Sequence, residues 1–216
     1  MIPNKNLQVG RQRFSKLFWD IIGEEDGDEE ISICEIVDEQ QHLRFMADYK
    51  TGSVPVEDAI DLFLIVKHFQ PKVIAEVGTF IGVSTRVMSE AAQELSMIYT
   101  CDVSNNITVH EGNLLISQFP KTPSHEMFKF LADTERKVDL VYLDGRLGQD
   151  DIEPLSKIIH DKTVFVMDDF EGIEKGVINA MMIEAPNRVL IYPRNGNKTA
   201  ISIPFTLLQI VPQEAV

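Results

Sequence analysis

Apolar residues in this chain switch repeatedly between helical and strand-like spacing from Glu57 onward. A helix is predicted over 57–69, because apolar residues recur there at intervals of three and four and Pro71 closes the pattern. Short, continuous apolar runs follow, as expected of parallel strands buried on both faces, and helical patterns separate most of them. The predicted strands are 72–77, 97–101, 107–110, 138–143, 163–167, 188–192 and 200–211.

This alternation predicts a doubly wound α/β sheet. Its last two strands, 188–192 and 200–211, are joined only by the seven residues PRNGNKT. That connection is too short for a crossover helix and carries a hairpin turn signal. The sheet is therefore expected to be mostly parallel and to end in an antiparallel pair.

The first 50 residues are predicted to form an N-terminal helical extension, and residues 51–216 the main domain. Apolar residues between Phe14 and Ile22 have helical spacing, and their exposed stripe favours a homodimer. The stretch 24–30 holds six acidic residues and is interpreted as a solvated loop. The run ISICEIV, which contains Cys34, has a strand-like pattern.

Composition narrows the function classes. The 216 residues are 44% hydrophobic, enough for one domain with a sizeable core, without a run of about 18 apolar residues for a membrane helix. A net charge of −14 repels nucleic-acid phosphates and anionic lipids, so neither is expected as a partner. Two cysteines, Cys34 and Cys101, make no disulfide framework, and the opening residues lack a signal-peptide pattern. A cytoplasmic location is expected.

The ligand of an open α/β sheet lies beyond the carboxyl ends of its strands, so strand exits are informative. The first predicted strand runs into EVGTFIGVST, where Gly78 and Gly82 let the backbone approach a ligand and Ser84 or Thr85 can cap the next helix. The second strand ends in Asp102, a carboxylate placed to accept two ribose hydroxyl protons. A dinucleotide is the rival ligand, but Glu76 in this loop would repel a pyrophosphate, and G-x-G-x-x-G is absent.

Three aspartates follow the fourth and fifth predicted strands: Asp144, Asp168 and Asp169. Carboxylates gathered at one sheet edge repel one another unless they are protonated or neutralised, and Mg²⁺ prefers such oxygen ligands. The alternative interpretation is that Asp168 and Asp169 cap a helix starting near Gly172 and bind nothing.

Taken together, these features resemble the class I S-adenosylmethionine-dependent methyltransferases, and within them the cation-dependent O-methyltransferases of catechol and macrolide-sugar type. The resemblance runs from about Thr51 to the C-terminus. It is carried by EVGTFIGVST, the acid in YTCDVS, EGN after the third predicted strand, VYLDG after the fourth and MDDF after the fifth. It implies a Rossmann-like sheet of seven strands in the order 3-2-1-4-5-7-6.

The resemblance also implies a site and a reaction. Asp102 would hold the ribose of S-adenosylmethionine, Val103 would pack on the adenine, and the three aspartates would be the catalytic Mg²⁺ ligands. That ion would lower the pKa of a small-molecule hydroxyl and fix its oxygen in line with the methyl–sulfur bond. The implied cofactor-binding residues are Glu76, Gly78, Thr79, Phe80, Gly82, Ser84, Asp102, Val103, Gly112, Asn113 and Asp144.

One position departs from the family pattern. Catechol-type enzymes carry a general-base lysine three residues after the first metal aspartate, where this chain has Leu147. The base is unassigned: Asp150 and Asp151 are possible proton acceptors or simply begin the next helix. Two further hypotheses stay open, a metal-independent methyltransferase acting on nitrogen or a carboxylate, and a catalytically silent domain that binds the nucleoside.

Overall fold

The computed structural model describes residues 33–37, 53–104, 115–170, 188–191 and 198–204, together with Lys175 and Asn179. The predicted helix at 14–22 and the acidic loop at 24–30 lie outside the described residues, so the extension and the homodimer stay predictions. Within the described part of the chain, no helix is both long and apolar enough to cross a membrane.

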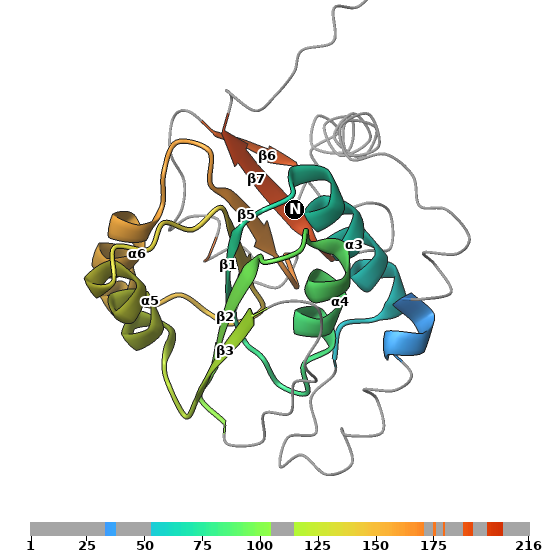
Figure 1. The fold of residues 1–216 in the computed structure, drawn as a ribbon, viewed down its shortest axis with the longest axis horizontal. Helices are drawn as coiled ribbons and strands as arrows, with labels where there is room; N and C mark the ends of the chain where they lie inside the picture. Colours follow the sequence, from blue (N-terminus) through green and yellow to red (C-terminus); the bar gives the residue numbers. More distant parts are fainter. Residues whose placement is uncertain are drawn as a thin grey trace, which may run out of the picture.

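Seven strands form one sheet in the order β3-β2-β1-β4-β5-β7-β6, which is the predicted order (Figure 1). The first five in this order run parallel, and β7 pairs antiparallel with both β5 and β6. The strands are β1 (Val73–Val77), β2 (Met97–Asp102), β3 (Leu115–Pro120), β4 (Leu140–Leu143), β5 (Val164–Met167), β6 (Arg188–Ile191) and β7 (Ala200–Pro204).

Helices cover both faces of this sheet, as a doubly wound fold requires (Figure 1). On one face lie α3 (Val56–Phe69) and α4 (Val83–Ala91); on the other lie α5 (Ser124–Asp133) and α6 (Ile152–Ile158), the latter preceded by η2 (Gln149–Asp151). Each face has its own hydrophobic core, and neighbouring strand residues alternate between them: Ile74 faces the α3/α4 core and Ala75 the α5/α6 core. Both cores are needed to bury the short apolar strands completely.

Three sequence-based predictions need correction. The third strand is Leu115–Pro120, which pairs in parallel with β2, so EGN precedes this strand instead of following it. Within ISICEIV, residues 33–37 are helical and bury Ile33, Ile36 and Val37, the spacing of one helix face. Helix α5 was not predicted, although it buries Met127, Phe128 and Leu131.

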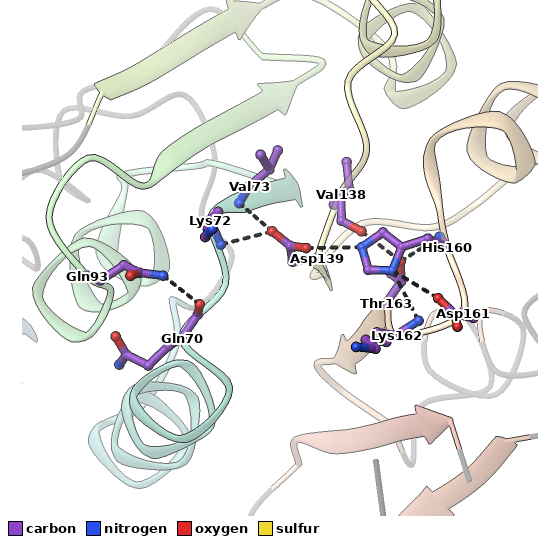
Figure 2. Close-up of polar contacts among 10 residues, drawn as sticks. All are labelled: Gln70, Lys72, Val73, Gln93, Val138, Asp139, His160, Asp161, Lys162 and Thr163. Carbon is purple, nitrogen blue, oxygen red and sulfur yellow. Dashed lines mark hydrogen bonds and ion pairs between the residues drawn. The ribbon is translucent and has the colours of Figure 1, made fainter. Parts of the chain in front are cut away.

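A polar clasp joins the amino ends of β1, β4 and β5, on the opposite edge of the sheet from the strand exits (Figure 2). Asp139 Oδ2 accepts hydrogen bonds from the backbone N–H groups of Lys72 and Val73, both at 2.9 Å. Its Oδ1 lies 3.0 Å from His160 Nε2. Thr163 Oγ1 accepts from the His160 N–H at 2.9 Å and donates to Val138 O at 2.7 Å. His160 thus has a structural role at the amino edge of the sheet.

Candidate functional site

A cavity of about 820 Å³ lies at the carboxyl edge of the sheet. The loops after β1, β2, β3, β4 and β5 all contribute to its wall, as do Ser53 and Pro55 at the start of α3. Its volume is that of a pocket for a small ligand or cofactor. The site therefore lies where the topology of an open α/β sheet predicts it.

The loop after β1 is held close to the loop after β4. Gly78 has a φ of +100°, and a Cβ there would lie 3.2 Å from both Asp144 C and Gly145 N. Gly145 in turn leaves no room for a side chain, because a Cβ would lie 2.6 Å from Val77 Cγ1. Glycine is the residue that adopts the left-handed conformation of Gly78 without strain, and the close packing at Gly145 also requires a residue without a side chain. Gly78 and Phe80 from this loop line the cavity.

Glu76 has a different place from the one expected. Its side chain has no exposed surface, and its two oxygens accept hydrogen bonds of 2.5 Å from Ser84 and Thr85 of α4. Burial raises the pKa of Glu76, and the hydroxyl hydrogen bonds oppose that shift. Thr79 is also buried and bonds to Thr100. These residues fix the loop and the start of α4 from behind the cavity wall.

Asp102 lines the cavity and organises its surroundings. Its Oδ2 accepts from the Phe80 N–H at 2.8 Å and its Oδ1 from the Ser104 N–H at 2.7 Å. Each carboxylate oxygen keeps a second lone pair, so the side chain can still accept two hydroxyl protons from a ligand. Beside it, the side chain of Val103 is 70% exposed and offers an apolar surface to the cavity.

The predicted adenine edge, Gly112 and Asn113, lies outside the described residues. The loop after β3 and the start of α5 contribute Thr122, Pro123, Ser124 and His125 to the cavity wall. Asp151 also lines it: the residue is 3% exposed, its Oδ2 accepts from the Gly148 N–H, and its Oδ1 has no partner among the described residues. Sequence reasoning missed this loop because it misplaced β3.

Asp144, Asp168 and Asp169 do come together, and we refer to them as the acidic cluster. One oxygen of each lies within 4.8 Å of the others. Lys175 Nζ lies 2.6 Å from Asp144 Oδ1 and 2.7 Å from Asp169 Oδ2, and Lys198 Nζ lies 3.3 Å from Asp169 Oδ1. Neither lysine was singled out from the sequence.

The three carboxyl groups titrate differently because their surroundings differ. Burial raises the pKa of Asp144 to about 6, although Lys175 opposes the shift, so this group is ionised at neutral pH. Burial, reinforced by Asp144 and Asp169, raises the pKa of Asp168 to about 7. For Asp169 the ammonium groups of Lys175 and Lys198 outweigh its burial and lower the pKa. Asp168 Oδ1 is buried and accepts no hydrogen bond from the described residues.

Leu147 and Cys101, two other residues near the acidic cluster or the cavity, are not suited to accept a proton from a substrate. Leu147, where the family pattern has a lysine, is 2% exposed and packs in the α5/α6 core, while its N–H donates to Asn179 Oδ1 at 2.9 Å. Cys101 lines the cavity, but burial raises the pKa of its thiol well above neutrality.

Comparisons with known proteins place this fold. No protein-family model and no curated protein sequence matches the chain. Among solved structures, a protein from Klebsiella pneumoniae assigned as an O-methyltransferase superposes with a TM-score of 0.59 at 14% identity, covering 90% of this chain and 98% of its own. An O-methyltransferase of tomaymycin synthesis from Streptomyces achromogenes, solved with S-adenosylmethionine, gives 0.56 at 14% over 90% and 98%. The O-methyltransferase from Bacillus cereus, solved with S-adenosylhomocysteine, gives 0.54 at 13% over 87% and 94%.

At these low identities the likeness establishes the architecture. The chain has the fold of the class I S-adenosylmethionine-dependent methyltransferases, with a cavity at the edge of the sheet where strand exits meet.

Proposed function

We propose that this protein is an S-adenosylmethionine-dependent methyltransferase that moves a methyl group to a hydroxyl oxygen of a small molecule. One observation carries the proposal: a single cavity joins Asp102, after β2, to the acidic cluster after β4 and β5. In the sheet β4 is two strand spacings from β2 and β5 is three, so about 10–14 Å separate the two groups. That span suits a nucleoside held at one end and a reacting group at the other.

Each part of the cavity then has a role. Asp102 accepts the ribose hydroxyl protons, Val103 and the loop 122–125 bracket the adenine, and Gly78 lets the backbone approach the ligand. Asp144 contributes a negative charge at the opposite side, where a cationic sulfonium is favoured. The residues present therefore fit this cofactor.

Bound S-adenosylmethionine supplies an electrophilic methyl group on a positively charged sulfur. The chain must orient the acceptor hydroxyl and take its proton as the oxygen–carbon bond forms and the carbon–sulfur bond breaks. Asp168 is the group in place for this, because the residue lines the cavity and its buried Oδ1 is without a partner among the described residues. A pKa of about 7 leaves a substantial fraction of Asp168 ionised at neutral pH, which suits a general base.

Magnesium assistance was predicted from the acidic cluster, and the arrangement of the cluster tests whether the ion fits. Three carboxylates match the oxygen ligands of a hard cation. The ammonium of Lys175, however, already contacts an oxygen of Asp144 and one of Asp169. As arranged, the cluster does not fit a metal ion bound to the oxygens that Lys175 contacts. The proposed mechanism therefore contains no metal step, and magnesium assistance stays a prediction.

Calorimetric titration of S-adenosylmethionine and S-adenosylhomocysteine into the full chain tests the cofactor. We expect micromolar-range binding that Asp102→Ala weakens by about tenfold or more, because two charge-assisted hydrogen bonds are lost. Asp133→Ala is the matched control, since Asp133 is an exposed residue of α5 that pairs with Lys129. The absence of nucleoside binding by the wild-type protein would overturn the proposal.

Transfer of a labelled methyl group to catechols, other phenols and sugar diols tests the acceptor. Methylated product from any of these supports transfer to oxygen. Product formed only from amines or carboxylic acids would replace the acceptor in the proposal, and tight nucleoside binding without transfer would instead favour a silent nucleoside-binding domain.

A further inference from the structure

Lys175 makes an unusually complete set of contacts with the acidic cluster. Its Nζ lies 2.6 Å from Asp144 Oδ1, 3.1 Å from the backbone carbonyl oxygen of Asp144 and 2.7 Å from Asp169 Oδ2. An ammonium group has three N–H donors and no acceptor. All three donors are therefore used within the cluster, so oxygen atoms surround the ammonium as ligands surround a bound metal ion.

A second lysine adds to this neutralisation. Lys198 Nζ lies 3.3 Å from Asp169 Oδ1. The chain around Lys198 is held in place, because the buried Asp58 of α3 accepts hydrogen bonds from the Lys198 N–H at 2.7 Å and the Thr199 N–H at 3.1 Å. Two ammonium groups thus face three carboxyl groups, which leaves at most one negative charge in the cluster.

We propose that the ammonium of Lys175 is the resident cation of the acidic cluster and that it keeps divalent metal ions out. For catalysis, this proposal means that methyl transfer needs no divalent metal, and that part rests on the proposed function. For metal binding, the proposal concerns only the side chains of the cluster and does not depend on the proposed function.

The coordination chemistry of Mg²⁺ explains why the two cations exclude one another. Mg²⁺ needs oxygen ligands at about 2.0–2.1 Å in near-octahedral geometry. Asp144 Oδ1 and Asp169 Oδ2 are the oxygens that Lys175 contacts most closely. An ion on the same two oxygens would displace their shortest hydrogen bonds and place two more positive charges beside a fixed one. The ammonium gains the attraction of the cluster with no entropy cost of binding from solution.

Titration with Mn²⁺ alone, followed by the paramagnetic resonance signal of the unbound ion, tests this directly on the full-length protein. The samples are the wild type, Lys175→Met, Lys175→Gln and the control Lys157→Met. Lys157 is an exposed lysine of α6 that pairs with Glu153 at 2.7 Å, so its substitution removes one positive charge outside the cavity. We expect the wild type and the control to bind Mn²⁺ weakly, and both Lys175 variants to bind it at least about tenfold more tightly.

Two results would overturn the proposal. One is wild-type binding of Mn²⁺ as tight as that of the Lys175 variants and lost in Asp144→Asn. The other is a failure of both variants to gain Mn²⁺ binding although circular dichroism shows them folded. If neither variant folds, the wild type decides: strong binding removed by Asp144→Asn contradicts the proposal, and weak binding supports it. Titrating the same samples with S-adenosylhomocysteine reports separately on the proposed function.

Discussion

Asp139→Ala is the substitution that best tests how the amino edge of the sheet is held together. One carboxylate oxygen of Asp139 accepts hydrogen bonds from two backbone N–H groups at the start of β1, each at 2.9 Å (Figure 2). The other oxygen contacts the ring of His160. Alanine removes all three contacts. The two N–H groups of residues 72 and 73 then lose their acceptor at the point where β1 enters the sheet.

The size of the effect follows from these contacts. A hydrogen bond to a charged group contributes about 1.5–3 kcal/mol. The Asp139 side chain is 37% exposed, so water replaces part of what is lost. We therefore expect the free energy of unfolding to fall by about 2–4 kcal/mol. Asparagine keeps one acceptor oxygen for the two amides, and we expect it to cost about half as much.

The asparagine variant also reports on the His160 ring. The Lys162 N–H donates to His160 Nδ1 at 3.1 Å, so in the neutral ring the proton sits on Nε2 and points at Asp139. With its oxygen turned to the two amides, asparagine would present an NH₂ group to that N–H. This lost hydrogen bond is the reason that Asp139→Asn is expected to be destabilising at all.

Urea unfolding followed by circular dichroism measures both variants, with the slope of the transition checked for constancy. Asp161→Ala is the control, because Asp161 lies 3.9 Å from the same ring but its side chain is 83% exposed, and we expect a change within about 0.5 kcal/mol. An Asp139→Ala protein as stable as this control would refute the reasoning. Cofactor binding by the folded variant should be unchanged, since the clasp and the cavity lie at opposite edges of the sheet.

Two further predictions concern the cavity itself. Gly78→Ala should weaken S-adenosylhomocysteine binding in calorimetry and lower the free energy of unfolding by about 1–3 kcal/mol. The reason is that Gly78 has a φ of +100° and the new Cβ would lie 3.2 Å from Asp144 C. Unchanged values in both measurements would contradict this. Asp168 has its pKa raised to about 7, so the folded state favours its protonated form and the wild type loses stability as the pH rises from about 4 through 7. Asp168→Asn lacks that loss, so its free energy of unfolding relative to the wild type should rise by up to about 2.5 kcal/mol between pH 5 and pH 8 in urea unfolding; a difference independent of pH would count against the shifted carboxyl group.

The central strands were predictable because their physics is local. β1, β4 and β5 are continuous apolar runs, and they are buried along nearly their whole length, as such runs must be in a parallel sheet. The edge strand β3 carries no such signal, since most of its residues are exposed or half-buried and Ser117, Gln118 and Pro120 interrupt it. Edge strands need only one buried face. That is why the run at 107–110, richer in β-branched residues, was preferred and the third strand was misplaced.

The site was predictable only where strand ends determine it. Asp102, Asp144 and Asp168 follow directly from β2, β4 and β5, and the topology brings them to one cavity. The partners of Glu76 could not be inferred in the same way: whether its carboxylate faces a ligand or the hydroxyls of Ser84 and Thr85 depends on how α4 packs, which no spacing in the sequence reveals.

Lys175 shows the same limit most sharply. Carboxylates crowded at one edge of a sheet need protons or positive charge, and that much follows from the sequence. A metal ion from solution and an ammonium from the chain satisfy that need equally well, so the positions of the aspartates alone do not choose between them. Lys175 is 31 positions from Asp144, and only the path of the chain after β5 returns it there. The chain has 34 acidic and 20 basic residues and is strongly negative overall. Two lysines nevertheless neutralise most of the charge of this one cluster. Net charge therefore says little about which cation a given cluster holds, and the position of one side chain decides it.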